Sequence, residues 1–383
     1  MTRILFFIES LSSGGAEKVL TTLLKHMDYS KYEVILMPLV DKGVLKNDID
    51  LSNLDYTPII REGGAPWLRL WYKIKYKLIY HYLPCRLANR WVIPRKGIDL
   101  YIAFTEGFAT KLLSFTPQKK IAWVHADLKT DPWTQNSHIY QSLEEEKTAY
   151  QRYNQVVCVS KAVEQVMKDL YSLQHATTIY NPIDTGVILH GAKQLINFTP
   201  SSSFKIVTVG RLVPQKGFDR LIRIVGKLMR NGTDVELYII GEGTERKNLV
   251  HIIQEESLEK QVHLMGFLDN PYALMAKMNL FVCSSIAEGY SLVIAEAMTL
   301  GLPVLSTDCA GPKELLGNGK YGLLVDNNPN ALYKGILQTI ESPEILKELK
   351  RKSIEKRTDL GIERSIRDIE SIIYDCIIPT NHY

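Results

Sequence analysis

Cysteine is scarce in this sequence, and long apolar runs are missing. The 383 residues contain five widely spaced cysteines: Cys85, Cys158, Cys283, Cys309 and Cys376. No two have the short spacing of a metal or redox motif, so we expect buried, reduced thiols. No stretch approaches the roughly 18–20 consecutive apolar residues of a membrane-spanning helix. The first apolar run, Ile4–Ile8, ends at Glu9 and is too short for a signal peptide, which predicts a cytoplasmic protein.

A large excess of charge of either sign is also absent. The formal net charge is +4, with 23% charged and 45% hydrophobic residues, which is the composition of an ordinary folded protein. A chain of 383 residues is too long for one ordinary core. The sequence therefore predicts two domains.

Strand-like apolar runs alternate with helical segments, which favours parallel sheets covered by helices on both faces. The first series is Ile4–Ile8, Val34–Val40, Leu100–Phe104, Ile121–His125, Val156–Ser160 and Thr177–Tyr180. The second series is Lys205–Gly210, Glu236–Gly241, Val262–Phe267, Leu280–Cys283 and Pro303–Thr307. Small and polar residues between the two series predict a linker. We therefore predict an α/β protein with two doubly wound units, residues 1–190 and 204–360, a linker over 191–203, and a C-terminal helix over 361–383 that crosses back to the first unit.

The first strand-like run is followed by Gly14-Gly15 and a helix with Leu20, Leu23 and Leu24 on one face. Glycines before a helix N-terminus allow the backbone to approach a phosphate. The motif is not Gly-x-Gly-x-x-Gly, so a nicotinamide site is not supported. Tight packing of the strand against the helix explains the glycines equally well.

The segment Gly63–Ile98 contains no Asp or Glu, and its basic residues alternate with aromatic ones. This composition is typical of a surface that docks on anionic lipid head groups. We therefore predict that residues 67–96 contact a membrane surface or a lipid-linked substrate. The alternative is a solvated basic helix whose tyrosines pack on the domain. Nothing else in the chain resembles a nucleic-acid-binding module, so nucleic acid is not an expected partner.

Several polar residues follow predicted strands, at the sheet edge where open α/β sheets bind ligands. His125 ends the run Ile121–His125, although a lone histidine is more often structural. Arg211 and Lys216 follow the first strand of the second unit, where an Arg fork and a Lys point charge would bind a diphosphate. Gly241-Glu242-Gly243 follows the next strand, where glycines would allow a nucleotide to approach the backbone.

The stretch Ser284–Glu296 has the strongest functional pattern. A helix is predicted to start near Ser291 and to end at Gly301, and its residues are apolar nearly all round, so it should be buried. Glu296 lies in its middle, and an ionised Glu is almost never buried without a partner. Glu288 precedes the helix, where free backbone amides favour an anion. This pattern suits a polyhydroxylated, phosphorylated ligand; the alternative is that Glu296 faces solvent and Glu288 is a loop charge.

Together these residues resemble glycosyltransferase family 4, of the two-domain type called GT-B. The motifs that carry the resemblance cover most of the chain in a specific order: Gly14-Gly15-Ala16-Glu17, Val159-Ser160-Lys161, Asn181-Pro182-Ile183-Asp184, Gly210-Arg211-Leu212 with Lys216-Gly217, Gly241-Glu242-Gly243, the E-x7-E pair Glu288 and Glu296, and Gly311-Pro312-Lys313-Glu314. The resemblance implies two Rossmann-like domains facing across a cleft. Within the family, the sequence is most similar to bacterial enzymes that build surface polysaccharides such as capsule or lipopolysaccharide.

The resemblance implies a retaining transferase that moves a hexose or N-acetylhexosamine from a nucleotide diphosphate sugar, by family frequency a UDP sugar, to a saccharide acceptor that is lipid-linked. Arg211 and Lys216 would stabilise the leaving diphosphate without a metal. Glu288 would bind hydroxyls of the donor sugar, Glu296 those of the ribose, and His125 would line the donor sugar and the acceptor. Further contacts to the nucleotide sugar are expected from Gly14, Gly15, Gly241, Gly243, Gly266, Phe267, Gly289, Tyr290, Ser291 and Leu292.

No metal or other cofactor is expected. Asp48-Ile49-Asp50 has the letters of the metal-binding D-x-D motif of another glycosyltransferase fold, but nothing else of that fold follows, so we interpret it as a chance match. The expected location is the cytoplasm, peripherally associated with the inner face of the cell membrane.

Three other functions remain open. A GT-B epimerase or phosphorylase would use the same residues without a lipid-linked acceptor, although no cofactor-binding lysine context of a phosphorylase is found. A non-catalytic partner subunit would position a true transferase. A membrane adaptor would bind vesicles but no sugar nucleotide. Turnover of a donor without acceptor would identify the epimerase, and vesicle binding without donor binding the adaptor.

Overall fold

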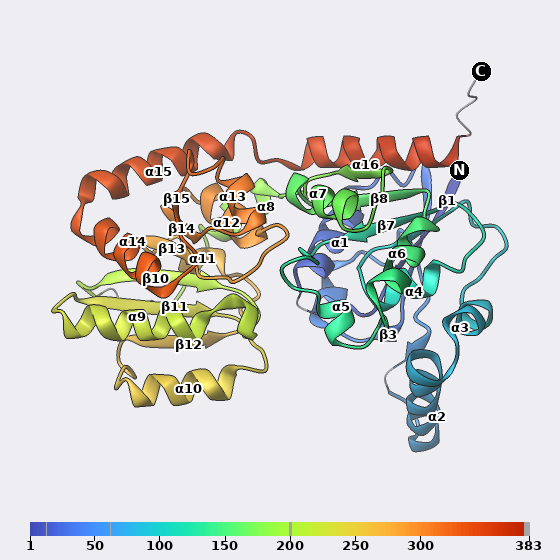
Figure 1. Cartoon of the computed structure of the whole chain (residues 1–383), viewed down its shortest axis with the longest axis horizontal. Coiled ribbons are helices and arrows are strands. Elements are labelled where there is room, and N and C mark those ends of the chain that lie inside the picture. The colour runs from blue at the N-terminus through green and yellow to red at the C-terminus, as the bar shows by residue number, and fades with distance from the viewer. Residues whose placement is uncertain (13, 62, 199–200, 379–383) are drawn as a thin grey trace. The chain divides into compact units, whose positions relative to one another are not determined.

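The computed structural model describes residues 1–12, 14–61, 63–198 and 201–378. Ser13 of the glycine-rich turn, Thr199 and Pro200 of the predicted linker, and the last residues of the predicted C-terminal segment lie outside the described residues. The chain divides into two compact units (Figure 1). The first contains Met1–Pro182 and the residues from Glu363 onward, and the second contains Ile183–Ile362.

The first unit has a seven-stranded parallel sheet with the order β4-β2-β1-β6-β7-β8-β9. Its strands are β1 (Thr2–Ile8), β2 (Tyr32–Pro38), β4 (Asp55–Tyr56), β6 (Leu100–Ala103), β7 (Lys120–Val124), β8 (Gln155–Cys158) and β9 (Ala176–Thr178); a separate pair is formed by β3 (Val40–Asp41) and β5 (Ile60–Arg61). The order reverses between β1 and β6. The central strands are fully buried, as their continuous apolar sequences predict.

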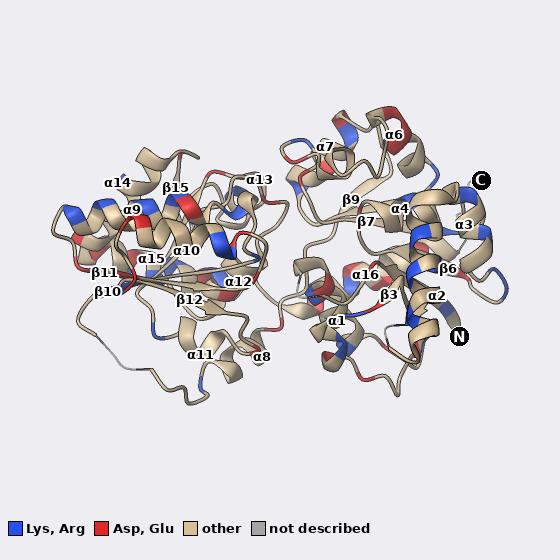
Figure 2. Ribbon diagram, turned by 90° about the horizontal axis from the view of Figure 1, so that it is seen from below, with Lys and Arg blue, Asp and Glu red and all other residues tan. Residues whose placement is uncertain are grey.

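Helices connect these parallel strands, since a parallel pair needs a crossover. They are α1 (Gly15–His26), α2 (Pro66–Lys77), α3 (Cys85–Val92), α4 (Phe108–Leu113), α5 (Trp133–Asn136), α6 (Leu143–Gln151) and α7 (Lys161–Asp169), with a 3₁₀ turn η1 (Val44–Asp48) and a π-helical turn η2 (Leu78–Tyr82). The last helix of the chain, α16 (Ile362–Ile377), is not a crossover between strands. The helix α2 projects from the rest of the unit (Figure 1). Seen from below, α2 and α3 carry basic residues and no acidic ones (Figure 2).

The second unit has a six-stranded parallel sheet with the order β12-β11-β10-β13-β14-β15, which is the 3-2-1-4-5-6 order of the Rossmann fold. Its strands are β10 (Phe204–Val209), β11 (Val235–Ile240), β12 (Val262–Gly266), β13 (Leu280–Cys283), β14 (Val304–Thr307) and β15 (Leu323–Val325). The order reverses between β10 and β13. The loops that follow these two strands therefore lie at the switch point, where this fold binds ligands.

Two apolar cores cover the two faces of this sheet. Neighbouring residues of β10, Ile206 and Val207, belong to different cores, because successive side chains of a strand point to opposite faces. One core is completed by α9 (Phe218–Arg230), α10 (Arg246–Glu255) and α14 (Pro329–Glu341). The other is completed by α8 (Thr185–Gly191), α11 (Tyr272–Met275), α12 (Leu292–Thr299) and α13 (Ala310–Leu315). The remaining elements are the 3₁₀ turn η3 (Pro214–Lys216) and α15 (Pro343–Arg357).

The predicted strands are all observed, with ends displaced by a residue or two. The sequence missed β3, β4, β5 and β15, because strands of two or three residues are too short to show a period. Among the cysteines, Cys85 is only half-buried, whereas the others are buried, and all five are free thiols. In the described part of the chain, no helix is both long and apolar enough to cross a bilayer.

The boundary between the units differs from the predicted linker. The second unit begins at Ile183, so the described residues of the predicted linker 191–203 belong to it. The reason is that Ile183 and Ile188 pack into the core with Tyr272. At the other end, α16 lies within the predicted C-terminal helix over 361–383 and is grouped with the first unit, where Ile369, Ile372 and Ile373 are buried.

Candidate active site

The two loops at the switch point of the second unit are joined by an ion pair. Lys216 ends η3 after β10, and Glu288 lies in the loop between β13 and α12. Lys216 Nζ lies 2.5 Å from Glu288 Oε1, and the two side chains are only 18% and 9% exposed. Ser285 Oγ donates a hydrogen bond of 2.7 Å to the same Oε1. The described side-chain contacts of Glu288 thus fall on Oε1, which leaves Oε2 available to a hydroxyl group.

Three further hydrogen bonds connect these loops. Ser284 Oγ donates to the carbonyl of Lys216 at 2.9 Å, and Gln215 Nε2 donates to the carbonyl of Ala287 at 3.0 Å. The amide of Ile286 donates to the carbonyl of Gln215 at 2.7 Å. Backbone as well as side chains therefore set the distance between Lys216 and Glu288, which makes the pair preorganised.

Sequence reasoning missed Arg220, which supports this arrangement. Its Nε donates to the carbonyl of Ser284 at 2.9 Å and its Nη2 to the carbonyl of Ser285 at 2.9 Å. Burial lowers the pKa of this guanidinium. The same carbonyl group of Ser284 also lies close to Gly217. Gly217 has a φ of +61°, and a Cβ atom at this residue would stand 2.4 Å from the carbonyl oxygen of Ser284. The signal available in the sequence was the Lys-Gly-Phe-Asp-Arg run itself, in which the glycine permits the loop contact.

Glu296 is buried, as the pattern of its helix predicts. Glu296 is only 4% exposed, and the hydroxyl of Tyr272 donates a hydrogen bond of 3.3 Å to Glu296 Oε1. The interpretation of Glu296 as a solvent-facing residue is therefore wrong. The helix α12 ends at Thr299, and Gly301 follows with φ +74°, so the predicted glycine stop is confirmed.

The N-terminus of α12 has a buried hydroxyl without a partner. Ser291 is the N-cap residue and 2% exposed, yet its Oγ has no hydrogen-bond partner among the described residues. It follows Gly289 and Tyr290 and precedes Leu292, so it lies at the amide end of a helix beside the Glu288 loop. A buried, unsatisfied hydroxyl costs about 1–3 kcal/mol unless a ligand or water completes it. The position suits an anion.

Arg211 is exposed and forms no ion pair with the described residues, so its guanidinium is available to a ligand. Phe267 is 42% exposed in the loop after β12. These two residues lie at the carboxyl edge of the same sheet as Lys216, as the sequence predicts.

The glycines after β11 and β12 have a structural explanation. A Cβ on Gly241, whose φ is +142°, would stand 1.9 Å from the carbonyl oxygen of Gly210. A Cβ on Gly243 would stand 2.3 Å from the carbonyl oxygen of Leu212, and Gly266 has φ +71°. Contact between the protein's own loops therefore accounts for Gly241 and Gly243 without a nucleotide, and the positive φ accounts for Gly266.

In the first unit, His125 directly follows β7. Its Nε2 lies 2.9 Å from the carbonyl oxygen of Phe104, and its backbone amide donates to Glu106 Oε2 at 2.9 Å. A carbonyl only accepts hydrogen bonds, so Nε2 carries the proton. Burial lowers the pKa of His125 to about 4. The ring is therefore neutral near pH 7, and it can orient a substrate but supplies no positive charge to a transition state.

Gly14 and Gly15 are placed at the start of α1, as predicted. Gly14 is the N-cap residue, and a Cβ there would stand 2.1 Å from Glu17 Oε2. A carboxylate of the chain itself thus lies at this helix start, which is unfavourable for a phosphate unless Glu17 moves.

Two acids at the switch point of the first unit were also missed. Glu9 follows β1, and its Oε1 accepts from the amide of Phe108 at 3.2 Å. Burial, with the nearby Glu106 and Glu17, raises the pKa of Glu9 to about 7. Glu106 follows β6 and is 7% exposed. The position of Glu9 directly after the first strand was the signal that sequence reasoning overlooked.

The residues Asp48-Ile49-Asp50 form a local turn. Asp50 Oδ1 accepts from the amide of Ser52 at 3.0 Å and from its hydroxyl at 2.7 Å. Within the described residues, no three His, Cys, Asp or Glu side chains gather as a metal site.

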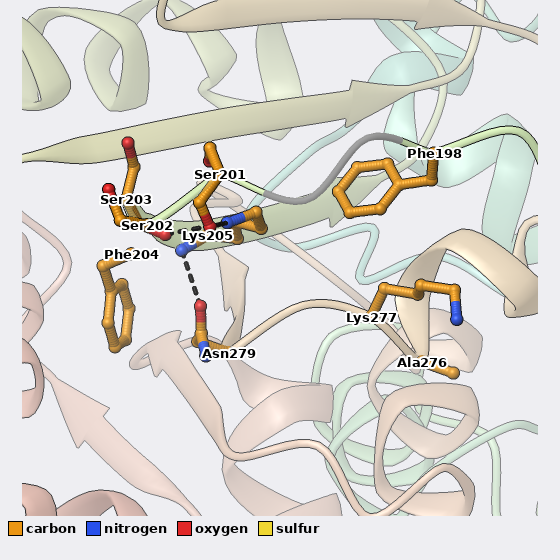
Figure 3. Close-up of a pocket in the computed structure, with 9 residues that line it drawn as sticks. All are labelled: Phe198, Ser201, Ser202, Ser203, Phe204, Lys205, Ala276, Lys277 and Asn279. Atoms are coloured by element: carbon orange, nitrogen blue, oxygen red, sulfur yellow. Dashed lines mark hydrogen bonds between the residues drawn. The ribbon is translucent and has the colours of Figure 1, made fainter.

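The cavity shown in Figure 3 lies elsewhere in the second unit. It has a volume of about 480 Å³ and is lined by residues at the start of β10, including Ser203, Phe204 and Lys205. The ammonium of Lys205 already donates to the carbonyls of Ser201 and Ser203 at 2.7 and 2.9 Å. This cavity is at the opposite end of β10 from Arg211, so it is separate from the candidate active site.

Comparisons with known proteins agree with this architecture. The family described as Glycosyltransferase Family 4 matches residues 13–187, and Glycosyl transferases group 1 matches residues 194–356. A relative from Campylobacter jejuni, N-acetylgalactosamine-N,N'-diacetylbacillosaminyl-diphospho-undecaprenol 4-alpha-N-acetylgalactosaminyltransferase, is 30% identical over 369 residues, which are 92% of this chain and 94% of the relative. The lipopolysaccharide core biosynthesis glycosyltransferase LpsE of Rhizobium meliloti is 30% identical over 171 residues, 45% of this chain and 49% of LpsE.

The fold is shared with solved structures. HepE from Anabaena, in complex with UDP and glucose, has a TM-score of 0.77 and 21% identity, over 98% of this chain and 100% of that one. Two parallel α/β units, the ion pair at the second switch point and a relative that matches nearly the whole chain point to one family: this chain is a GT-B glycosyltransferase and belongs to glycosyltransferase family 4.

Proposed function

We propose that this enzyme transfers a hexose or N-acetylhexosamine from a UDP sugar to a lipid-linked saccharide acceptor, with retention of anomeric configuration. The product would enter a surface glycan such as capsule or lipopolysaccharide. The observation that carries the proposal is the preorganised pair Lys216–Glu288 beside the buried, unpaired hydroxyl of Ser291 at the start of α12.

The leaving diphosphate gains negative charge when its bond to the sugar breaks. Lys216 and Arg211 supply positive charge at the same sheet edge, and Ser291 with the first amides of α12 supplies hydrogen-bond donors. Fixed donors aimed at developing charge lower the barrier without reorganising during the reaction. These protein groups neutralise the diphosphate in the proposed reaction, so no resident metal is part of it.

The two acids of the E-x7-E pair take different parts of the donor. Glu288 has a free Oε2 beside Lys216 and binds a sugar hydroxyl there. Glu296 is buried further along α12 and binds the ribose hydroxyls. The exposed ring of Phe267 borders the base. The choice of UDP is supported by the UDP complex of HepE, whose fold is the same.

The first unit binds the acceptor in this proposal. His125 is neutral, with Nδ1 free to accept from a hydroxyl, and the raised pKa of Glu9 near 7 suits a group that exchanges a proton with a saccharide. A lipid-linked acceptor is supported by the name of the Campylobacter relative, which acts on a diphospho-undecaprenol saccharide and forms an α linkage. With an acceptor of this kind, the location that we propose is the cytoplasm, at the inner face of the cell membrane.

The test is release of UDP from a panel of UDP sugars by the purified protein, with and without lipid-linked acceptor extracted from membranes. We expect one donor to be used, faster with acceptor, and the rate to fall at least ~100-fold in Glu288→Ala and Lys216→Ala, as for loss of one preorganised group. Lys320→Ala is the matched control, because Lys320 pairs with Glu355 on the exposed surface of the same unit, outside the family motifs.

Two results would contradict the proposal. If no donor is used under any condition, the transferase reaction fails. If a donor is converted to a different sugar nucleotide without acceptor, the enzyme is an epimerase. Retention is tested on the isolated product by the anomeric coupling constant in its NMR spectrum, compared with that of the donor.

A further inference from the structure

The helix α2 has an apolar face that nothing in the described chain covers. None of its residues is buried. Trp67, Leu70, Trp71 and Ile74 are 69%, 61%, 47% and 42% exposed. Their spacing of three, four and seven residues places them on one side of the helix. Four large apolar side chains gathered on one exposed face mark an interaction surface.

Basic residues border this apolar face. Arg69, Lys73 and Lys77 recur every four residues along α2 and are exposed, and no Asp or Glu occurs from Gly63 to Ile98. Figure 2 shows Lys and Arg positions, and no Asp or Glu, along the ribbon of α2. A partner that covers the face must therefore be apolar where the tryptophans lie and anionic beside them.

The next helix has the same character. In α3, Leu87 and Trp91 are 53% and 48% exposed, one turn apart, and Arg86 and Arg90 precede them. The opposite side of α3 is anchored, since the buried Asn89 donates to the carbonyl of Leu112 at 3.1 Å and to Thr116 Oγ1 at 2.9 Å. The exposed side is thus presented by a fixed helix.

The back of α2 is also attached to the unit. Lys75 Nζ donates to the carbonyl of Ile59 at 2.9 Å. Tyr76 stacks on Tyr80 of η2 with ring centroids 5.3 Å apart, and Tyr80 stacks on Phe108 at 4.4 Å. Phe108 begins α4 and donates its amide to Glu9. The attached side of α2 is therefore connected through packed rings to the sheet edge that carries Glu9 and Glu106.

We propose that α2 lies in the plane of an anionic bilayer surface, with Trp67, Leu70, Trp71 and Ile74 inserted among the acyl chains and Arg69, Lys73 and Lys77 on the phosphates. Leu87 and Trp91 of α3 make a second, smaller contact. Membrane-surface helices combine such an apolar face with flanking cations, and tryptophan is favoured at the lipid–water boundary. Nucleic acid is a poorer partner, because Leu70 and Ile74 offer a base neither a stacking surface nor a hydrogen bond.

Vesicle flotation of the full chain is the direct test. The probes are vesicles of phosphatidylcholine alone and of phosphatidylcholine with 30% phosphatidylglycerol, at low and at high salt. We expect binding to the anionic vesicles only, with a blue shift of tryptophan emission and quenching by lipids brominated in the acyl chain. Three of the five tryptophans, Trp67, Trp71 and Trp91, lie in this segment, so the emission reports on it.

Two sets of variants separate apolar from electrostatic contributions. Trp67→Ser with Trp71→Ser should weaken binding at least about tenfold at every salt concentration. Lys73→Gln with Lys77→Gln should weaken it about fivefold per cation at low salt and less at high salt. The matched control for charge is Lys347→Gln with Lys350→Gln, which removes two exposed cations from α15. The matched control for apolar exposure is Ile354→Ser, a residue 44% exposed on the same helix.

Equal binding to both kinds of vesicle, absence of quenching, or equal losses in the α2 variants and in their controls would overturn the proposal. Failure to float, combined with retention on nucleic acid, would assign the face to a different partner. The variants should keep the melting temperature of the parent protein, since no residue of α2 is buried. Release of UDP from a soluble donor does not use this face, so its outcome is independent of vesicle binding.

Discussion

Lys216 and Glu288 form an ion pair across the point where the strand order of the second sheet reverses, although 72 positions separate them in the chain. The pair is nearly buried, so each charge depends on the other. Removing one partner leaves the other without compensation, which is the costly case for buried charges.

We therefore predict that Glu288→Ala and Lys216→Ala each lower the free energy of unfolding by about 2–3 kcal/mol. The double variant should be more stable than the sum of the two losses implies, because no orphaned charge remains. Urea denaturation of the four proteins measures this coupling. The exposed pair Lys313–Asp308 serves as control, with an expected coupling of about 0.5 kcal/mol or less. Coupling equal to that of the control would show that burial adds nothing.

Gly241 should be intolerant of any side chain. Gly241→Ala combines a φ of +142° with a Cβ placed 1.9 Å from the carbonyl oxygen of Gly210. We expect this substitution to lower the free energy of unfolding by more than about 3 kcal/mol. Gly232→Ala isolates the conformational part, because Gly232 has a φ of +84° and open space around its Cβ position. The free energy of unfolding of this control variant should fall by about 1 kcal/mol. Thermal denaturation compares the two, and similar losses would refute the contact between the loops.

The neutral state of His125 predicts a loss of stability in acid. Its pKa is lowered to about 4 in the folded chain, whereas a free histidine titrates near 6.5. The contribution of neutral His125 to the free energy of unfolding is complete above pH 6.5 and is lost as the pH falls toward 4. In this range the unfolded chain binds a proton at His125, whereas the folded chain does not. Between pH 6.5 and 4, the free energy of unfolding should therefore fall by about 3 kcal/mol more in the parent protein than in His125→Gln. NMR titration of the histidine rings measures the pKa of His125 directly, and a value near 6.5 would contradict this prediction.

Glu9 predicts the opposite dependence at higher pH. Its pKa is raised to about 7, so the folded chain favours the neutral carboxyl, and this contribution is present below pH 4.5 and lost as the pH rises through 7. Glu9→Gln should therefore be more stable than the parent at pH 8, by a few degrees in Tm, and the difference should vanish near pH 4.5. Its retained acceptor oxygen can still bind the amide of Phe108. A parent and variant with parallel pH profiles would contradict the shifted pKa.

Charge neutralisation by Lys216 and Arg211 predicts activity without divalent metal ions. UDP release should change less than about twofold when EDTA is added. In the presence of EDTA, Arg211→Gln should lower kcat, since the exposed guanidinium is available to the diphosphate. Loss of activity on chelation that Mg²⁺ or Mn²⁺ restores would show that a metal shares this role.

Local patterns in the chain were enough for much of the fold. Apolar runs such as Leu280–Cys283 marked the central strands, because a strand buried on both faces must be apolar throughout. The burial of the helix around Glu296 could be predicted for the same reason, because its residues are apolar nearly all round. Gly301 predicted where that helix ends. The exposed basic face of α2 was also readable from composition, since it depends on residues that are close in sequence.

The ion pair, the unpaired hydroxyl of Ser291 and the place of Glu9 were decided by tertiary structure. Lys216 and Glu288 meet only because the crossover from β10 to β11 and the one to β13 leave in opposite directions, which brings two distant loops together. The role of Gly241 could likewise not be predicted, because the atom that excludes a side chain belongs to Gly210, in the loop that follows β10. Sequence shows which side chains are available and how they repeat; contacts between loops distant in the chain depend on the order in which the strands assemble.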